Sequence, residues 1–63
     1  MEAWQERVVT EKKELDEKLT RLQSFLSSDI FGTLPRGIQS VMTRQANAMY
    51  AYSEALRERI ENF

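Results

Sequence analysis

The chain contains no cysteine and no histidine, and it has only one proline and two glycines among 63 residues. Without cysteine there is no disulfide framework, and without either residue type zinc lacks its usual ligands. Catalysis by a nucleophile paired with histidine is excluded as well. We therefore expect no enzyme: no catalytic residue, no metal site and no cofactor.

Long apolar runs are also missing. No stretch approaches the roughly 18 apolar residues of a membrane helix, and the N-terminal residues lack the apolar core of a signal peptide. Hydrophobic residues make up 41% of the chain and charged residues 30%, a balance typical of folded rather than disordered proteins. We expect a single domain over residues 1–63, with no membrane partner.

Positive and negative charges nearly cancel, but they are unevenly distributed. The net charge is −1, so binding to long nucleic acid, which requires a strongly basic surface, is not expected. From Arg36 to Ser53, however, Arg36 and Arg44 are the only charged residues. A small anion can be accommodated in this acid-free stretch.

Hydrophobic residues recur at alternating steps of four and three, the 3.5-residue spacing of helices that pack against other helices. The two series are here termed the predicted seam. In the first half of the chain its members are Met1, Gln5, Val8, Lys12, Leu15, Leu19, Leu22 and Leu26. In the second half they are Ile38, Met42, Gln45, Met49, Tyr52, Leu56, Arg59 and Phe63.

This pattern predicts an all-α fold, a two-helix antiparallel hairpin with helices at about 3–27 and about 35–62. The connection at about 28–34 contains Ile30, Phe31 and Leu34, so we expect a folded corner rather than a free linker. Thr33 is a candidate N-cap for the second helix, which places Pro35 in its first turn.

One hairpin buries too little apolar surface to offset the conformational entropy lost when the chain is ordered. The second helix also carries a stripe of small residues that lets another helix approach closely, made of Val41, Ala48, Ala51 and Ala55. We therefore expect an obligate, symmetric helical homo-oligomer with an even number of subunits, such as a dimer of hairpins.

Three polar side chains occupy the predicted seam: Lys12, Gln45 and Arg59. A buried cation costs free energy unless an anion meets it. Lys12 is therefore a register-setting residue, a lysine whose ammonium extends past the edge of the interface, or a cation held between subunits to receive a phosphate. Arg59 faces the same choice, or it satisfies the last carbonyl groups of its helix. Gln45 is expected to fix the register through a buried hydrogen bond.

Aromatic and further cationic residues complete the candidates. Trp4 is either a cover over the edge of the oligomer or a platform on which a base stacks. Tyr52 lies on the predicted seam, whereas Arg7 and Arg44 lie off it, as solvated charges or as cations that reach an interface pocket. The candidate ligand-binding residues are Trp4, Arg7, Lys12, Arg44, Tyr52 and Arg59.

Two stretches of the chain carry a family resemblance. The first is the run RVVTEKKELDEKL at 7–19, followed by Leu22 and Phe25. The second is the pattern Gln45-x-x-x-Met49-x-x-Tyr52-x-x-x-Leu56-x-x-Arg59-Ile60-x-x-Phe63. Together they resemble a family of small helical proteins found in crAss-like and many other bacteriophages. That family is similar in turn to phage anti-CBASS sponges, helical hexamers that sequester the cyclic oligonucleotides used by bacterial immune systems.

The resemblance implies a phage anti-defence protein. It would bind a cyclic dinucleotide or trinucleotide at pockets between subunits, without cleaving it, in the cytoplasm of the infected bacterial host. It also adds a hexamer to the expected assemblies. The alternative is a small oligomeric helical module with a structural or protein-interaction role.

Overall fold

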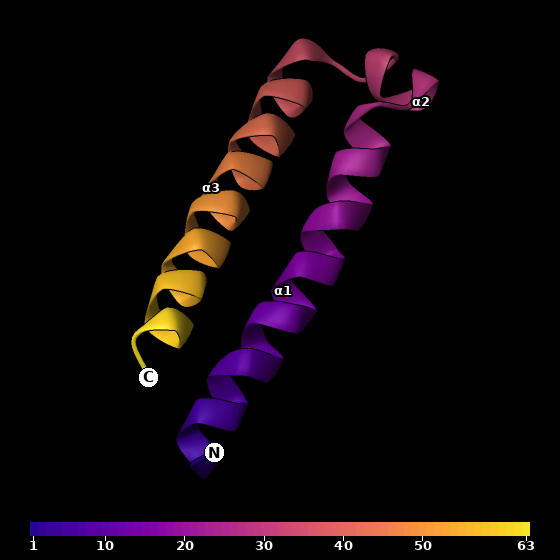
Figure 1. Ribbon diagram of the computed structural model, residues 1–63. Helices are drawn as coiled ribbons and strands as arrows, with labels where there is room; N and C mark the ends of the chain where they lie inside the picture. Colours follow the sequence, from indigo (N-terminus) through magenta and orange to yellow (C-terminus); the bar gives the residue numbers. More distant parts are fainter.

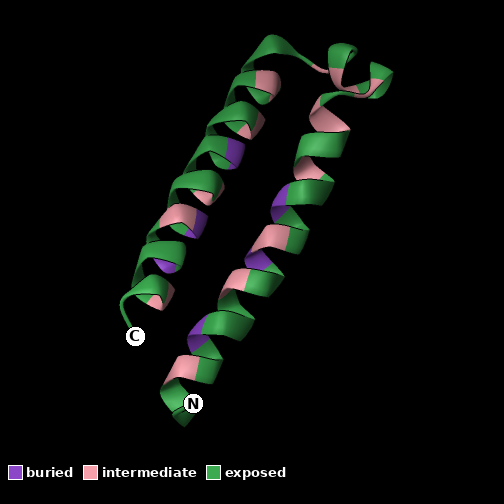
Figure 2. Cartoon of the chain, viewed as in Figure 1, coloured by how far each residue is buried: buried purple, intermediate pink, exposed green.

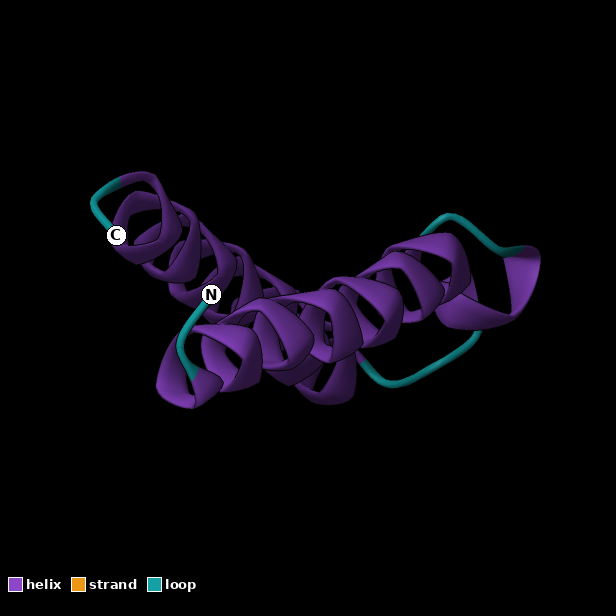
Figure 3. Cartoon of the chain, turned by 60° about the horizontal axis from the view of Figure 1, so that its bottom comes forward, coloured by secondary structure: helices purple, strands orange, loops and turns teal.

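Two long helices lie side by side and antiparallel, and a short helix joins them at one end (Figure 1). The computed structural model describes residues 1–63. Helix α1 spans Ala3–Leu26, α2 spans Asp29–Gly32 and α3 spans Arg36–Glu61. No strand is present, and the N- and C-terminal residues lie at the same end of the hairpin (Figure 3). The all-α hairpin predicted from the sequence is confirmed, while its assembly with further copies stays a prediction.

Side-chain hydrogen bonds cap both ends of the short helix α2, and a proline precedes the start of α3. Ser28 is the N-cap of α2, and its hydroxyl oxygen accepts a hydrogen bond from the backbone N–H of Phe31. Thr33 is not the N-cap of α3, so that prediction is wrong. Its hydroxyl donates to the carbonyl oxygen of Ile30 at 2.6 Å and closes α2 instead. The ring of Pro35 disfavours helical dihedrals at the preceding residue, Leu34, so α3 cannot extend back into the corner. Pro35 is the N-cap of α3, and the helix begins at Arg36.

The corner is anchored by only part of its apolar set. The ring of Phe31 packs edge-on against that of Phe25, with 6.3 Å between centroids. Leu34 is half-buried, and its carbonyl oxygen accepts a hydrogen bond from the side-chain amide of Gln39 at 2.7 Å. Ile30, in contrast, is 63% exposed. The corner therefore closes the hairpin through Phe31 and Leu34 and presents Ile30 outward.

Buried residues line the facing sides of the two long helices and leave their outer sides exposed (Figure 2). On α1 they are Val8, Leu15 and Leu19, all members of the predicted seam. On α3 the side chain of Leu56 is 1% exposed and packs with Val8 and Leu15. No helix of the chain is both long enough and apolar enough to cross a membrane.

On α3 the predicted seam is displaced by one residue at several positions. Gln45, Tyr52 and Arg59 are exposed, while their neighbours Ala46 and Ser53 are buried. The inner seam of α3, which faces α1, consists of Gln39, Met42, Ala46, Met49, Ser53, Leu56 and Ile60. The physical reason is size: alanine and serine allow the helices to approach closely, whereas a hydrophobicity ranking favours the adjacent tyrosine.

Leu56 should carry a large share of the hairpin's stability. Because the side chain is enclosed, Leu56→Ala leaves a cavity and should lower the free energy of unfolding by about 2–5 kcal/mol. Tyr50→Ala, at a residue of α3 that is 57% exposed, is the matched control and should change it by less than about 0.5 kcal/mol. Urea titration followed by circular dichroism measures both. Equal losses from the two substitutions would contradict this packing.

Candidate functional site

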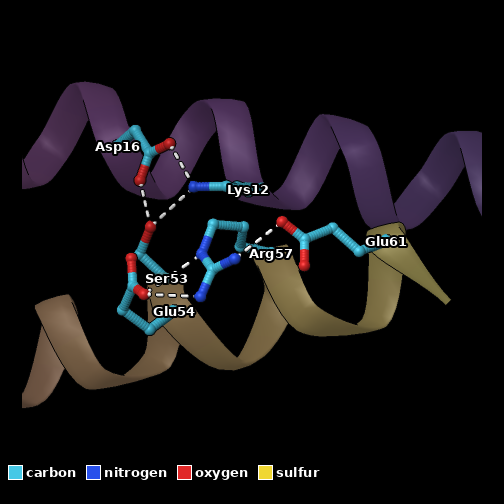
Figure 4. Close-up of polar contacts among 6 residues, drawn as sticks. All are labelled: Lys12, Asp16, Ser53, Glu54, Arg57 and Glu61. Atoms are coloured by element: carbon cyan, nitrogen blue, oxygen red, sulfur yellow. Dashed lines mark hydrogen bonds and ion pairs between the residues drawn. The ribbon is translucent and has the colours of Figure 1, made fainter.

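A closed triangle of polar side chains bonds α1 to α3 in the middle of the hairpin (Figure 4). The ammonium of Lys12 donates to Asp16 Oδ2 at 2.8 Å and to Ser53 Oγ at 2.9 Å. The hydroxyl of Ser53 in turn donates to Asp16 Oδ1. The lysine on the predicted seam is thus met by an anion from its own chain, one helical turn away. This pairing is the arrangement expected if Lys12 sets the register between the two helices.

The triangle changes the acidity of its carboxyl group. The hydrogen bonds from Lys12 and from Ser53 stabilise the ionised form and hold the pKa of Asp16 below its ordinary value of 3.8. An open hollow of about 510 Å³ lies beside the triangle. Its lining consists of Val9, Lys12, Lys13, Asp16, Glu17, Thr20 and Ile60. Two lysines and two carboxylates balance each other there, so the hollow has no evident preference for an anion.

At the open end of the hairpin an aromatic pair joins the two helices. The rings of Trp4 and Phe63 meet edge to face, with 5.1 Å between centroids. Arg7 follows Trp4 by three residues and Arg59 precedes Phe63 by four, spacings that place each on the same side of its helix as its aromatic neighbour. Neither guanidinium takes part in any of the three ion pairs of the chain. These four residues are termed the cationic end.

The remaining candidates lie elsewhere. Tyr52 is 46% exposed and precedes Arg59 by seven residues, so it lies on the same side of α3, two turns away. Arg44 precedes Arg59 by 15 residues, about 22 Å along the helix at 1.5 Å per residue. Lys12 is held in the triangle. Helical spacing therefore places Arg7 and Arg59 at the same end of the hairpin as the Trp4–Phe63 pair, whereas Lys12 and Arg44 lie elsewhere.

On other parts of the surface, acidic side chains either neutralise an arginine or would repel an anion. Arg57 is bonded by Glu54 at 3.0 Å and by Glu61 at 2.6 Å (Figure 4), so its charge is already neutralised. A second hollow of about 450 Å³ lies along α1 and is lined by Ala3, Glu6, Arg7, Thr10, Glu11 and Glu14. Its three glutamates disfavour a phosphate, so an anion would approach Arg7 from the side of α3 and Arg59.

Three residues of these arrangements escaped the sequence analysis as site residues: Asp16, Ser53 and Phe63. The four-residue spacing from Lys12 to Asp16 was an available signal, because such pairs face each other on a helix. Ser53 lies seven residues from both Ala46 and Ile60, so the 3.5-residue spacing also contained it. The meeting of Phe63 with Trp4 depends on how the corner sets the two helices against each other, and no local pattern reports that.

The fold and this surface define a small helical hairpin protein with a candidate surface for ligands that carry negative charge and flat rings. No group of acidic, histidine or cysteine side chains is arranged to hold a metal ion. The family model described as Sequestin matches residues 2–62, and the chain belongs to the Sequestin family. That name denotes sequestration, which fits the resemblance to phage anti-CBASS sponges. No curated protein and no solved structure matches the chain.

The triangle predicts an acid-sensitive part of the stability. Because the pKa of Asp16 is lower in the folded protein than its ordinary value of 3.8, its contribution is present above that value and is lost as the pH falls through the folded pKa. The difference in free energy of unfolding between the native protein and Asp16→Asn should therefore shrink below about pH 4. Glu17→Gln, which removes the adjacent carboxylate and leaves the triangle intact, is the matched control. Denaturation curves between pH 7 and about pH 2 test this prediction. A difference in free energy of unfolding that stays constant with pH would refute the ionised triangle.

Proposed function

We propose that this protein sequesters a cyclic dinucleotide or trinucleotide at pockets between the subunits of a homo-oligomer, and that it does not cleave the ligand. The observation that carries the proposal is the cationic end, where Arg7 and Arg59 have no acidic partner and lie beside the Trp4–Phe63 pair. Membership of the Sequestin family supports the sequestering part. The nucleotide part rests on the chemistry of this surface and on the resemblance to phage sponges.

Such a ligand presents two kinds of group, and the cationic end suits both. Guanidinium groups bind phosphate oxygens through paired, charge-assisted hydrogen bonds. Exposed aromatic rings stack on bases, and Trp4 retains 49% of its exposure despite its contact with Phe63. Sequestration requires only that the ligand remains bound, so no catalytic group is needed.

Symmetry explains how so short a chain can surround a ligand. In a two-fold assembly every cation and every ring appears twice, so residues of two copies can line one pocket. Tyr52 and Arg44 would enter the pocket from neighbouring copies. Lys12 stays a candidate, because an ammonium has three donors and only two are used by Asp16 and Ser53.

Binding and recovery of the ligand test the proposal directly. A panel of cyclic dinucleotides and trinucleotides should include one that, at about 100 times its Kd, raises the free energy of unfolding by about 2.7 kcal/mol. After the complex is denatured, chromatography should return that nucleotide intact. Linear or cleaved product that accumulates at catalytic protein concentration would refute sequestration. Absence of binding across the panel would favour the protein-interaction module instead.

Two arginines that lie two residues apart on α3, Arg57 and Arg59, provide a matched pair of variants. Arg59→Met should weaken binding about 10- to 100-fold, because a hydrogen bond to a charged group contributes about 1.5–3 kcal/mol. Arg57→Met removes an equal charge that is already paired with Glu54 and Glu61, and it should leave the affinity within about twofold, since exposed ion pairs contribute little. Calorimetric titration measures both, and equal effects would show that only net charge matters.

A further inference from the structure

Helix α3 carries a second complete series with 3.5-residue spacing, and this series has no partner in the chain. It consists of Ile38, Val41, Gln45, Ala48, Tyr52, Ala55 and Arg59, all exposed, and is termed the outer seam. Its steps alternate strictly between three and four residues. That spacing is the signature of a helix packed against another helix along its whole length.

The outer seam is turned away from the side of α3 that packs on α1. Each of its residues directly precedes a residue of the inner seam, as Gln45 precedes Ala46 and Tyr52 precedes Ser53. One residue corresponds to about 100° around a helix, so the outer seam is turned roughly a right angle away from α1. Three of its side chains remain about half exposed in the hairpin: Ile38 at 49%, Val41 at 48% and Tyr52 at 46%.

We propose that the outer seam is the interface with α3 of a second copy of this chain, packed antiparallel about a two-fold axis at Ala48. The inference deepens the homo-oligomer of the proposed function, on which it rests only for the expectation of an assembly and not for the ligand. The need for such a contact follows from the burial, because a single hairpin buries only 6 of its 63 residues.

The series is complementary to itself in this register. Val41 and Ala55 each lie seven residues from Ala48, so Val41 of one copy comes level with Ala55 of the other. Gln45, three residues before Ala48, comes within one residue of the level of Tyr52, four residues after it. Val41 thus meets a small side chain, and Ala48 meets itself on the axis, which permits the close approach of the two helices.

The charges select the antiparallel arrangement. A parallel pair would place Arg59 against Arg59, with no acidic residue on the outer seam to separate them. In the antiparallel pair the two Arg59 residues lie about 33 Å apart at 1.5 Å per residue. Arg44, four residues before Ala48, comes level with Tyr52 of the second copy, four residues after it. Arg44 of one copy thereby comes within about two helical turns of Arg59 of the other, measured along the helix axis.

Single cysteines test the register cleanly because the chain has none of its own. Ala48→Cys should form a covalent dimer in high yield on oxidation or with a short bis-maleimide linker. Ala55→Cys alone should not, since its copies lie about 21 Å apart, but a mixture with Val41→Cys should yield the mixed dimer. Tyr50→Cys, on the opposite side of α3, sets the background. Efficient Ala55 homodimers would overturn the antiparallel arrangement, and yields at background for every position would overturn the interface.

Sedimentation of a charged variant gives a second readout. Ala48→Glu places two carboxylates on the axis and should shift the protein toward half its mass, whereas Asn47→Glu, exposed on the far side, should not. If Ala48→Glu unfolds instead, the cysteine variants still decide. A cross-linked Ala48→Cys dimer that retains no cyclic nucleotide would refute the ligand and keep the interface. A native protein that captures nucleotide as a monomer would refute the interface and the inter-subunit pocket, and would keep the ligand.

Discussion

The bonded triangle of Lys12, Asp16 and Ser53 fixes how α3 is rotated about its own axis, and the environment of every other residue of that helix follows from this rotation. With Ser53 turned toward α1, Tyr52 must face one flank of the hairpin and Glu54 the other, since neighbours differ by about 100°. No buried side-chain nitrogen or oxygen of the chain lacks a hydrogen-bond partner. A satisfied polar network of this kind favours one register over its alternatives, because a one-residue slip would leave its members unpaired.

That rotation also separates the charges into two unlike flanks. On one flank Arg57 is neutralised by Glu54 and Glu61. On the other flank α3 presents the outer seam, in which Arg59 is the only charged residue and no acid is present. Apolar surface and unpaired positive charge therefore coincide on the same side. A ligand with phosphates and a second helix would both be attracted to this flank, and neither would be attracted to the opposite one.

The limits of the sequence analysis follow from side-chain size. On α1 one series of large apolar residues contains the buried Val8, Leu15 and Leu19, so the spacing located the buried side correctly. On α3 two seams run one residue apart, and the buried one contains Ala46 and Ser53, whose side chains carry less apolar surface than that of Tyr52. Gln45 and Arg59 were consequently assigned to the hairpin interface, where they do not lie. Residue type alone indicated Trp4 and Arg59 as binding candidates, but their proximity through Phe63 is a product of the tertiary fold.

Folding, the proposed assembly and the proposed capture of a ligand would be thermodynamically connected in such a chain. Tyr52 and Arg59 belong both to the outer seam and to the candidate ligand site, so a ligand held there contacts the region that a second copy covers. A ligand that touches both copies strengthens their association, and by linkage the association raises the affinity for the ligand by the same factor. The second copy likewise stabilises the folded hairpin, because it binds only the folded form. A protein too small to enclose a core of its own can in this way obtain its stability from the same surface with which it captures a ligand.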